Sequence, residues 1–79
     1  MARVLLFGRL ADLAGWRHRP VEAASLSALR LALAADDPAL GEALAGPGVQ
    51  TAVDQAIVRG EADLTAASEV AFMPPMSGG

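Results

Sequence analysis

Cysteine and lysine are both absent from the 79 residues of this chain. Without cysteine the chain has no disulfide, no thiolate nucleophile and no thiolate metal site, so any sulfur that it handles must sit on another group. Without lysine, no side chain can accept an isopeptide bond, which argues against a tag that forms polymers on itself. A compositional preference for arginine is the simpler reason for the missing lysine.

Aromatic residues, basic charge and long apolar runs are also scarce. With only two Phe and one Trp, the core is expected to be aliphatic, and residues 1–79 are expected to form a single domain. The net charge of −3 and the six scattered arginines argue against nucleic acid. No apolar run is long enough for a membrane span and no signal peptide is apparent, so we expect a cytoplasmic protein with no membrane partner.

Candidate catalytic and metal-binding side chains are few. His18, the single histidine, stands between two arginines without a nucleophile beside it, and we interpret it as a solvated residue. Asp36 and Asp37 form an acidic pair, but no third ligand stands nearby, so a helix-capping role is favoured over a metal site. There is no phosphate-binding loop of the Walker type and no dinucleotide fingerprint. We therefore expect no catalytic constellation and no metal in the chain itself.

The most informative stretch is the last one, which runs from an apolar strand into a bare backbone. Val70 and Phe72 alternate with the residues between them as in a β-strand, and Pro74 and Pro75 then stop the ladder and send the chain off in an extended direction. The final residues offer little bulk, so such a tail can thread a narrow channel. This expected tail comprises Pro74, Pro75, Met76, Ser77, Gly78 and Gly79, of which 76–79 form its extended end. Frayed chain is the alternative for any Gly-Gly end.

Apolar spacing predicts three helices in the rest of the chain. A short helix is expected from Arg9 to a left-handed Gly15, with Leu10, Leu13 and Ala14 on its inner side. The main helix should follow a cap at Ser25 or Ser27, and its inner stripe is Leu26, Leu29 and Leu33. Asp37 should cap a third, short helix that starts at Pro38 and turns Leu40 and Leu44 inward.

Alternating or short apolar runs predict strands at 3–8, 17–23, 49–53, 56–59 and 70–73. Pro20 places the second run at a sheet edge, and Asp54-Gln55 is expected to turn a hairpin. This order fits an α+β fold in which a mixed sheet grasps one main helix. If the alternate residues face that helix, an apolar patch is left on the open face, and such a patch is typical of a docking surface. Its expected members are Leu5, Phe7, Ile57 and Met73.

Three segments together resemble the small subunit of molybdopterin synthase. These are the opening run from Arg3 to Gly8, Ala-Val-Asp-Gln from Ala52 to Gln55, and Val-Ala-Phe-Met-Pro-Pro-Met-Ser-Gly-Gly from Val70 to Gly79. The resemblance runs end to end and implies a ubiquitin-like sulfur carrier with a β-grasp fold. Two features depart from the family pattern, Asp54 in place of the usual Asn and Ala66-Ala67-Ser68 in place of the common Asp-Gly-Asp turn.

The resemblance implies a cycle in which the Gly79 carboxylate is the reacting group. A ubiquitin-activating-type adenylyltransferase would use ATP to adenylate Gly79, and a persulfide sulfur donor would convert the adenylate to a thiocarboxylate. The tail would then enter the large subunit of molybdopterin synthase and give its sulfur to cyclic pyranopterin monophosphate, building the dithiolene. By the same analogy the assembly is a heterotetramer, and the chain alone binds no cofactor.

Two other interpretations stay open. A sulfur carrier of another pathway, such as thiamine thiazole synthesis, shares the fold and the Gly-Gly end, although the Pro74-Pro75 pair resembles the molybdopterin branch more. A β-grasp interaction module with an inert terminus belongs to a different class. Removal of Gly79 separates the classes, because only a carrier would lose sulfur transfer while still folding.

Overall fold

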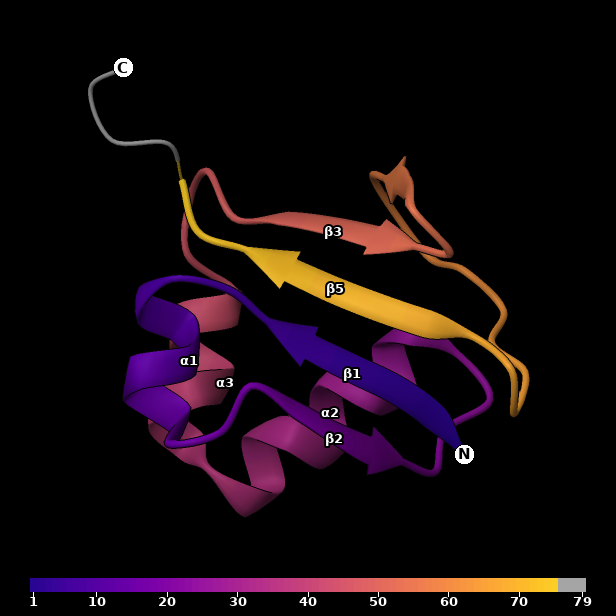
Figure 1. The fold of residues 1–79 in the computed structure, drawn as a ribbon, viewed down its shortest axis with the longest axis horizontal. Coiled ribbons are helices and arrows are strands. Elements are labelled where there is room, and N and C mark those ends of the chain that lie inside the picture. Colours follow the sequence, from indigo (N-terminus) through magenta and orange to yellow (C-terminus); the bar gives the residue numbers. More distant parts are fainter. Residues whose placement is uncertain (76–79) are drawn as a thin grey trace.

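The computed structural model describes residues 1–75, and residues 76–79 lie outside the described part. Figure 1 shows the described chain as one sheet with helices behind it. The elements in chain order are β1 (Ala2–Leu6), α1 (Arg9–Ala14), β2 (His18–Val21), α2 (Leu26–Asp36), α3 (Pro38–Leu44), β3 (Gln50–Val53), β4 (Ala56–Val58) and β5 (Glu69–Met73). No helix in this part of the chain is long and apolar enough to cross a membrane.

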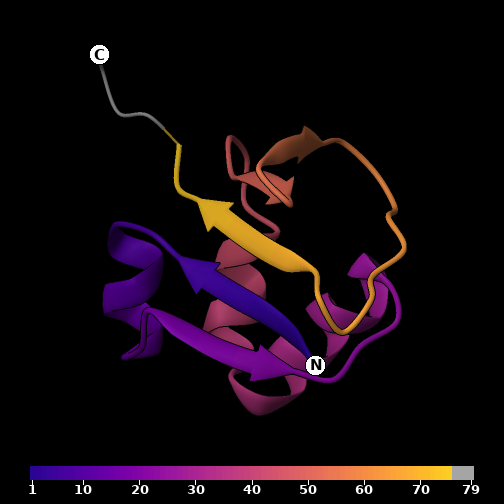
Figure 2. The same ribbon diagram turned by 45° about the vertical axis from the view of Figure 1, so that its right-hand side comes forward.

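The strands form one mixed sheet in the order β2-β1-β5-β3-β4. β1 and β5 run parallel at its centre, and the other neighbouring pairs are antiparallel. The helices all lie on one side of the sheet, as the two ribbon views agree (Figures 1 and 2). The expected α+β class, with a mixed sheet that grasps a main helix, is confirmed, and β2 with its Pro20 stands at an edge of the sheet as predicted.

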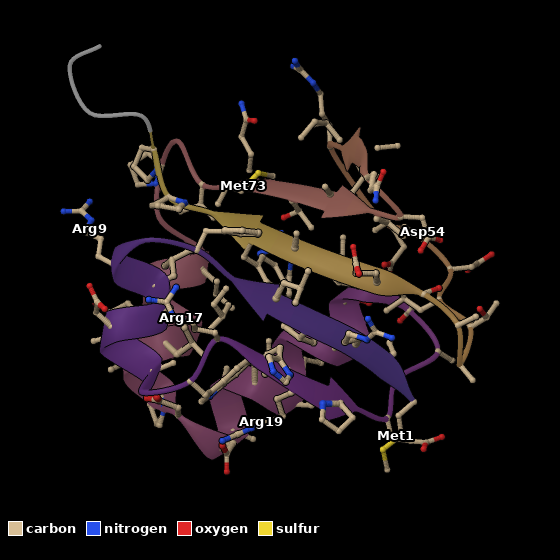
Figure 3. The ribbon with its side chains drawn as sticks, in the orientation of Figure 1. Met1, Arg9, Arg17, Arg19, Asp54 and Met73 are labelled. Atoms are coloured by element: carbon tan, nitrogen blue, oxygen red, sulfur yellow. The ribbon has the colours of Figure 1, made fainter. Side chains whose placement is uncertain are left out.

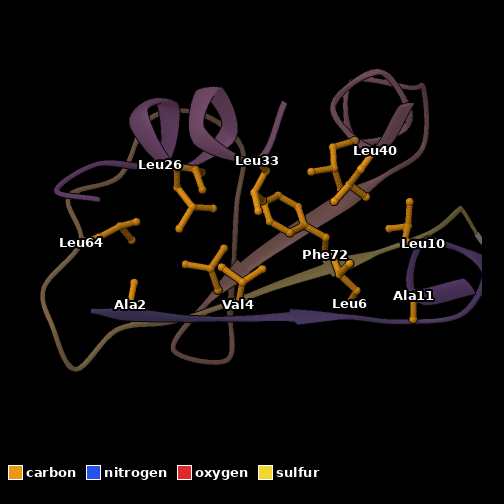
Figure 4. Close-up of a cluster of buried hydrophobic side chains, with 13 residues drawn as sticks. Ala2, Val4, Leu6, Leu10, Ala11, Leu26, Leu33, Leu40, Leu64 and Phe72 are labelled. Carbon is orange, nitrogen blue, oxygen red and sulfur yellow. The ribbon is translucent and has the colours of Figure 1, made fainter. Parts of the chain in front are cut away.

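The core lies between the helices and one face of the sheet (Figure 4). The predicted stripe of Leu26, Leu29 and Leu33 on α2 is buried there against Val70 and Phe72, which are fully buried on β5. Burial of each such side chain contributes roughly 1.5–3 kcal/mol relative to exposure. These residues therefore fix the helix-facing side of every central strand, and the alternate residues must point to the open face.

Side-chain caps begin the two larger helices, as the sequence predicts. The Ser25 hydroxyl accepts a hydrogen bond from the Ala28 amide at 3.2 Å, and the Asp37 carboxylate accepts one from the Leu40 amide at 3.2 Å. Each cap satisfies a backbone donor that the first helical turn leaves without a partner. Asp36 instead accepts a hydrogen bond from Arg19 at 2.9 Å, so the acidic pair is engaged in capping and an ion pair.

The inner face of α1 differs from the prediction. Leu10 and Ala11 are the buried residues of this helix, and Leu13 is 49 % exposed. The spacing of Leu10, Leu13 and Ala14 marks one helical stripe, but in a helix of 6 residues the stripe can rotate by one position. Here the small Ala11 is the residue that turns inward, which leaves a large apolar side chain on the surface.

The Asp54-Gln55 hairpin is confirmed. Both residues have positive φ, 50° for Asp54 and 70° for Gln55, which is the geometry of the two-residue turn that matches strand twist. Asp54 also binds the start of β5, because the Glu69 amide donates to the Asp54 carboxylate at 2.9 Å and the Asp54 amide donates to the Glu69 carbonyl at 2.8 Å. The turn thus fixes the near end of the strand whose far end carries the tail.

Candidate functional site

The base of the tail lies where three segment ends meet. β5 runs between β1, which is parallel to it, and β3, which is antiparallel. The loop after β1 and the loop before β3 must therefore both lie at the carboxyl end of β5. These two loops contain Gly8 and Gly48, and the first residues beyond β5 are Pro74 and Pro75. Sheet topology alone brings these four residues together.

The two glycines seat the two prolines, and we call this group of Gly8, Gly48, Pro74 and Pro75 the tail cradle. A β-carbon added to Gly8 would lie 2.9 Å from Cγ of Pro74, and one added to Gly48 would lie 2.7 Å from Cβ of Pro75. Both glycines also have positive φ, 56° and 83°. Each position therefore favours glycine on conformational and steric grounds. The cradle fixes the direction in which the chain leaves the sheet.

Arg30 braces the segment that carries Gly48. From α2 its guanidinium donates to the Thr51 hydroxyl on β3 at 2.8 Å and to the Leu44 carbonyl at the end of α3 at 3.4 Å. The same group lies over the ring of Phe72, 5.3 Å from its centroid. Because these contacts hold both ends of the α3–β3 connection, they stabilise one side of the tail cradle.

Substitution of alanine at Gly48 is expected to disturb the tail base, whereas the same change at Gly15 is not. Both glycines have φ of 83°, so both variants pay the left-handed penalty of roughly 1–2 kcal/mol. A β-carbon at Gly15 meets nothing within 4 Å, while at Gly48 it meets Pro75. We expect both variants to lose stability on urea unfolding, with the larger loss in Gly48→Ala, and shifted NMR resonances of Met73 and Pro75 only in Gly48→Ala.

The double variant Gly48→Ala with Pro75→Gly tests the cause of that shift. Removal of Cβ and Cγ from residue 75 makes its Cα, 3.6 Å from the added methyl, the nearest atom, and that is an ordinary contact. The Met73 resonances should then depend on Pro75→Gly alone, with no added effect of Gly48→Ala. Equal shifts at Met73 in Gly15→Ala and Gly48→Ala would contradict the cradle.

An apolar patch covers the open face of the sheet beside the tail. Strand register places Leu5, Ala71, Ala52 and Ile57 in one row across β1, β5, β3 and β4. Phe7 and Met73 lie one step nearer the tail, since the Phe7 amide donates to the Phe72 carbonyl at 3.2 Å. Figure 3 shows Met73 at the tail end of the sheet and Asp54 at the other end. We call these six apolar residues the sheet-face patch.

The structure places the predicted docking residues together on this face. Phe7 is 46 % exposed and Ile57 is 51 % exposed, whereas Leu5 and Met73 are half-buried. Ala71, which is half-buried, and Ala52, which is only 7 % exposed, were missed by sequence reasoning, although strand register could have found them. That the patch binds a partner stays a prediction.

The predicted tail residues are only partly within the described chain. Pro74 and Pro75 are described, and they form the tail cradle together with Gly8 and Gly48. Met76, Ser77, Gly78 and Gly79 lie outside the described residues. Sequence reasoning also missed Gly8 and Gly48 as contacts of the prolines, because no local pattern links positions so far apart in the chain.

Side chains suited to metal binding are not clustered in residues 1–75. There, no three His, Cys, Asp or Glu residues are placed to hold a metal ion. His18 is exposed on β2, as predicted. What the described part offers chemically is a positioned tail base beside an apolar surface.

The Glu61 carboxylate accepts hydrogen bonds that connect two parts of the fold. It accepts them from the Ser27 hydroxyl and, at 3.0 Å each, from the Ser27 and Ala62 amides. These bonds, the Ser27 side chain first among them, lower the pKa of Glu61 below its ordinary value. Because the folded-state pKa is depressed, their contribution to stability is present above the ordinary pKa and is lost as the pH falls through the depressed value. They bind the loop after β4 to the first turn of α2.

Comparison with known proteins links this arrangement to a family. The model of the ThiS family matches residues 4–79. Over 81 aligned positions, the chain is 36 % identical to a protein of Escherichia coli (strain K12) named molybdopterin synthase sulfur carrier subunit, and the alignment covers 100 % of both chains.

Solved structures of the same shape include two small archaeal modifier proteins. Small archaeal modifier protein 1 from Methanosarcina acetivorans superposes with a TM-score of 0.87 at 23 % identity, over 99 % of this chain and 95 % of that one. The protein of the same name from Haloferax volcanii gives a TM-score of 0.86 at 26 % identity, over 99 % and 98 %. These likenesses agree with the ubiquitin-like β-grasp architecture described above.

Proposed function

The chain belongs to the ThiS family, and on that premise we propose that it is the sulfur carrier and small subunit of a molybdopterin synthase. The observation that carries this proposal is the identity of 36 % along the whole chain to a molybdopterin synthase sulfur carrier subunit. The geometry supports it, because a positioned tail base stands beside an apolar patch of the kind that partners dock on. The reacting group is the carboxylate of Gly79.

A carboxylate is a poor electrophile, so the cycle begins with activation by a partner. A ubiquitin-activating-type adenylyltransferase joins the Gly79 carboxylate to AMP and releases pyrophosphate from ATP. The outer sulfur of a persulfide donor then attacks the acyl carbon and displaces AMP, which leaves an acyl disulfide, and a second thiol of the donor reduces its sulfur–sulfur bond and becomes oxidised to a disulfide. The product is a thiocarboxylate at Gly79. The chain contributes the carboxylate and its placement, and the partner contributes the catalytic side chains.

Sulfur transfer takes place in the large subunit of the synthase. The sheet-face patch docks there while the tail from Pro74 to Gly79 enters the active site. The thiocarboxylate sulfur bonds to a carbon of cyclic pyranopterin monophosphate as a carbon–oxygen bond at that carbon breaks and its oxygen leaves. Water then cleaves the acyl–sulfur bond, which regenerates the carboxylate and leaves the sulfur on the acceptor. Two such transfers complete the dithiolene. We place the two subunits in a heterotetramer, by analogy with the family.

The proposal is tested by the intact mass of the chain isolated from its own host. We expect a fraction in which one C-terminal oxygen is replaced by sulfur, and fragmentation should place that sulfur on Gly79. A chain that shows only the carboxylate, even after incubation with ATP, an adenylating enzyme and a sulfur donor, would point instead to an interaction module with an inert terminus.

The molecule that accepts the sulfur distinguishes a molybdopterin synthase subunit from related sulfur carriers. The family name and the fold also fit a carrier for thiamine thiazole synthesis, which uses the same thiocarboxylate, and the solved neighbours bear the name of modifier proteins. Thiocarboxylated chain mixed with cyclic pyranopterin monophosphate and the host's large subunit should yield molybdopterin. Sulfur delivered only to a thiazole precursor, or Gly79 found joined to another protein, would favour those alternatives.

A further inference from the structure

A hollow lies beside the tail base, on the side away from the sheet-face patch. Its walls come from α1, from the connection between α3 and β3, and from Pro74 and Pro75. The volume is about 570 Å³, and its lining includes the apolar residues Leu13, Pro47 and Val49 together with Arg9. Figure 3 shows Arg9 next to the point where the tail leaves the sheet. The hollow is large enough to seat a bulky apolar side chain.

Leu13 lines this hollow and is not part of the buried core. It is 49 % exposed, while its helix is anchored through Leu10 and Ala11. A single exposed leucine is normal on a protein surface, so exposure alone carries no conclusion. Leu31 on α2 is even more exposed, at 72 %, and is not among the residues that line this hollow. What distinguishes Leu13 is that it shares one cavity with the two prolines of the tail cradle.

The length of the tail determines what must cover this hollow. Four residues follow Pro75, so a fully extended backbone carries the Gly79 carboxylate at most about 14 Å beyond it. An enzyme that encloses this carboxylate must bring the rim of its channel close to Pro75. The surface on both sides of Pro75 is then covered at the same time, the sheet-face patch on one side and the hollow on the other.

We propose that this hollow is a second docking surface, which receives an apolar side chain from the channel rim of the enzyme that adenylates Gly79. The inference rests on the proposed function and extends it, because it assigns α1 and the α3–β3 connection to partner binding. Leu13 contacts the partner directly, and Pro74 and Pro75 form the shared wall between the tail and the partner's rim. Contacts on both sides of the tail align the channel with the direction that the cradle sets.

The test compares Leu13→Glu with Leu31→Glu, which places the same charge on an exposed leucine outside the hollow. Calorimetry would give the Kd of each variant for the host's adenylating enzyme, and pyrophosphate exchange would give the rate of adenylation. We expect Leu13→Glu to weaken binding at least about tenfold, as for a residue at the centre of an interface, and Leu31→Glu to change it less than about twofold. Leu13→Ala should weaken binding in the same direction by a smaller factor.

Two outcomes are distinguishable from one another. If the unmodified chain is adenylated and Leu13→Glu binds as Leu31→Glu does, the hollow is no docking surface and the proposed function stands. If the unmodified chain is never adenylated, the proposed function itself fails and the inference falls with it. Thermal unfolding of the three variants separates lost binding from lost folding, since a binding defect should appear in a variant that still melts cooperatively.

Discussion

Deletion of Gly79 is expected to lower the rate of adenylation at least about 100-fold while leaving docking and folding unchanged. The new terminal carboxylate, on Gly78, is set back by one residue, or roughly 3.5 Å of extended backbone. A misplacement of only 1 Å from the reacting geometry can cost about 100-fold in rate, so this shift removes the carboxylate from the site. Pyrophosphate exchange measures the rate, and calorimetry measures the affinity for the adenylating enzyme.

The matched control for this deletion is Ser77→Ala, which keeps the length of the tail and both glycines. It should retain most of the adenylation rate, because the backbone and the terminal carboxylate are preserved. Unfolding curves of all three chains should coincide, since the core is built from residues 2–72. Adenylation of the shortened chain at the rate of the full one would contradict the requirement for a terminal Gly79.

The fold, in which a sheet grasps a main helix, could be predicted from the sequence because its strongest signals are local. The stripe of Leu26, Leu29 and Leu33, the caps at Ser25 and Asp37, and the positive-φ turn each depend on a few neighbouring residues. The error at Leu13 has the same origin. A helix of 6 residues offers too few positions for local spacing to fix the orientation of its apolar stripe.

Only part of the candidate site could be predicted from the sequence. Alternation along strands placed Leu5, Phe7, Ile57 and Met73 on one face, since the side-chain period in a strand is two residues. The tail cradle could not be predicted from the sequence, because its contacts join Gly8 and Gly48 to prolines that lie far along the chain. Such contacts follow from strand order, and one strand slipped or exchanged would bring other loops to the tail.

From their positions, we expect the cradle and the patch to have separable roles. The cradle consists of backbone and proline rings at the end of β5, so it sets direction and offers little surface for affinity. The patch lies on the sheet itself and is held by four paired strands. A defect in the tail should therefore lower the rate of a bound complex, and a defect in the patch should lower the fraction bound.

Phe7→Asp is expected to weaken binding to the large subunit of the proposed synthase by about 30-fold or more. Phe7 is 46 % exposed and stands beside Met73 at the tail end of the patch, where a docked partner would exclude water. A carboxylate buried there without a partner costs several times the free energy of an ordinary lost contact, and aromatic residues at interface centres commonly contribute 2 kcal/mol or more, which is roughly 30-fold. Calorimetry with the thiocarboxylated chain measures the loss.

Phe7→Asp should weaken binding but leave the rate of sulfur transfer in the bound complex nearly unchanged. At saturating large subunit, the single-turnover rate of sulfur transfer should stay within about threefold of the unmodified chain, because a bound variant still presents the same tail. Leu31→Asp, which adds the same charge at a more exposed leucine on α2, should alter neither quantity. A Phe7→Asp chain that binds normally would place the partner elsewhere, and one that binds weakly and also transfers slowly when saturated would show that patch and tail act as one unit.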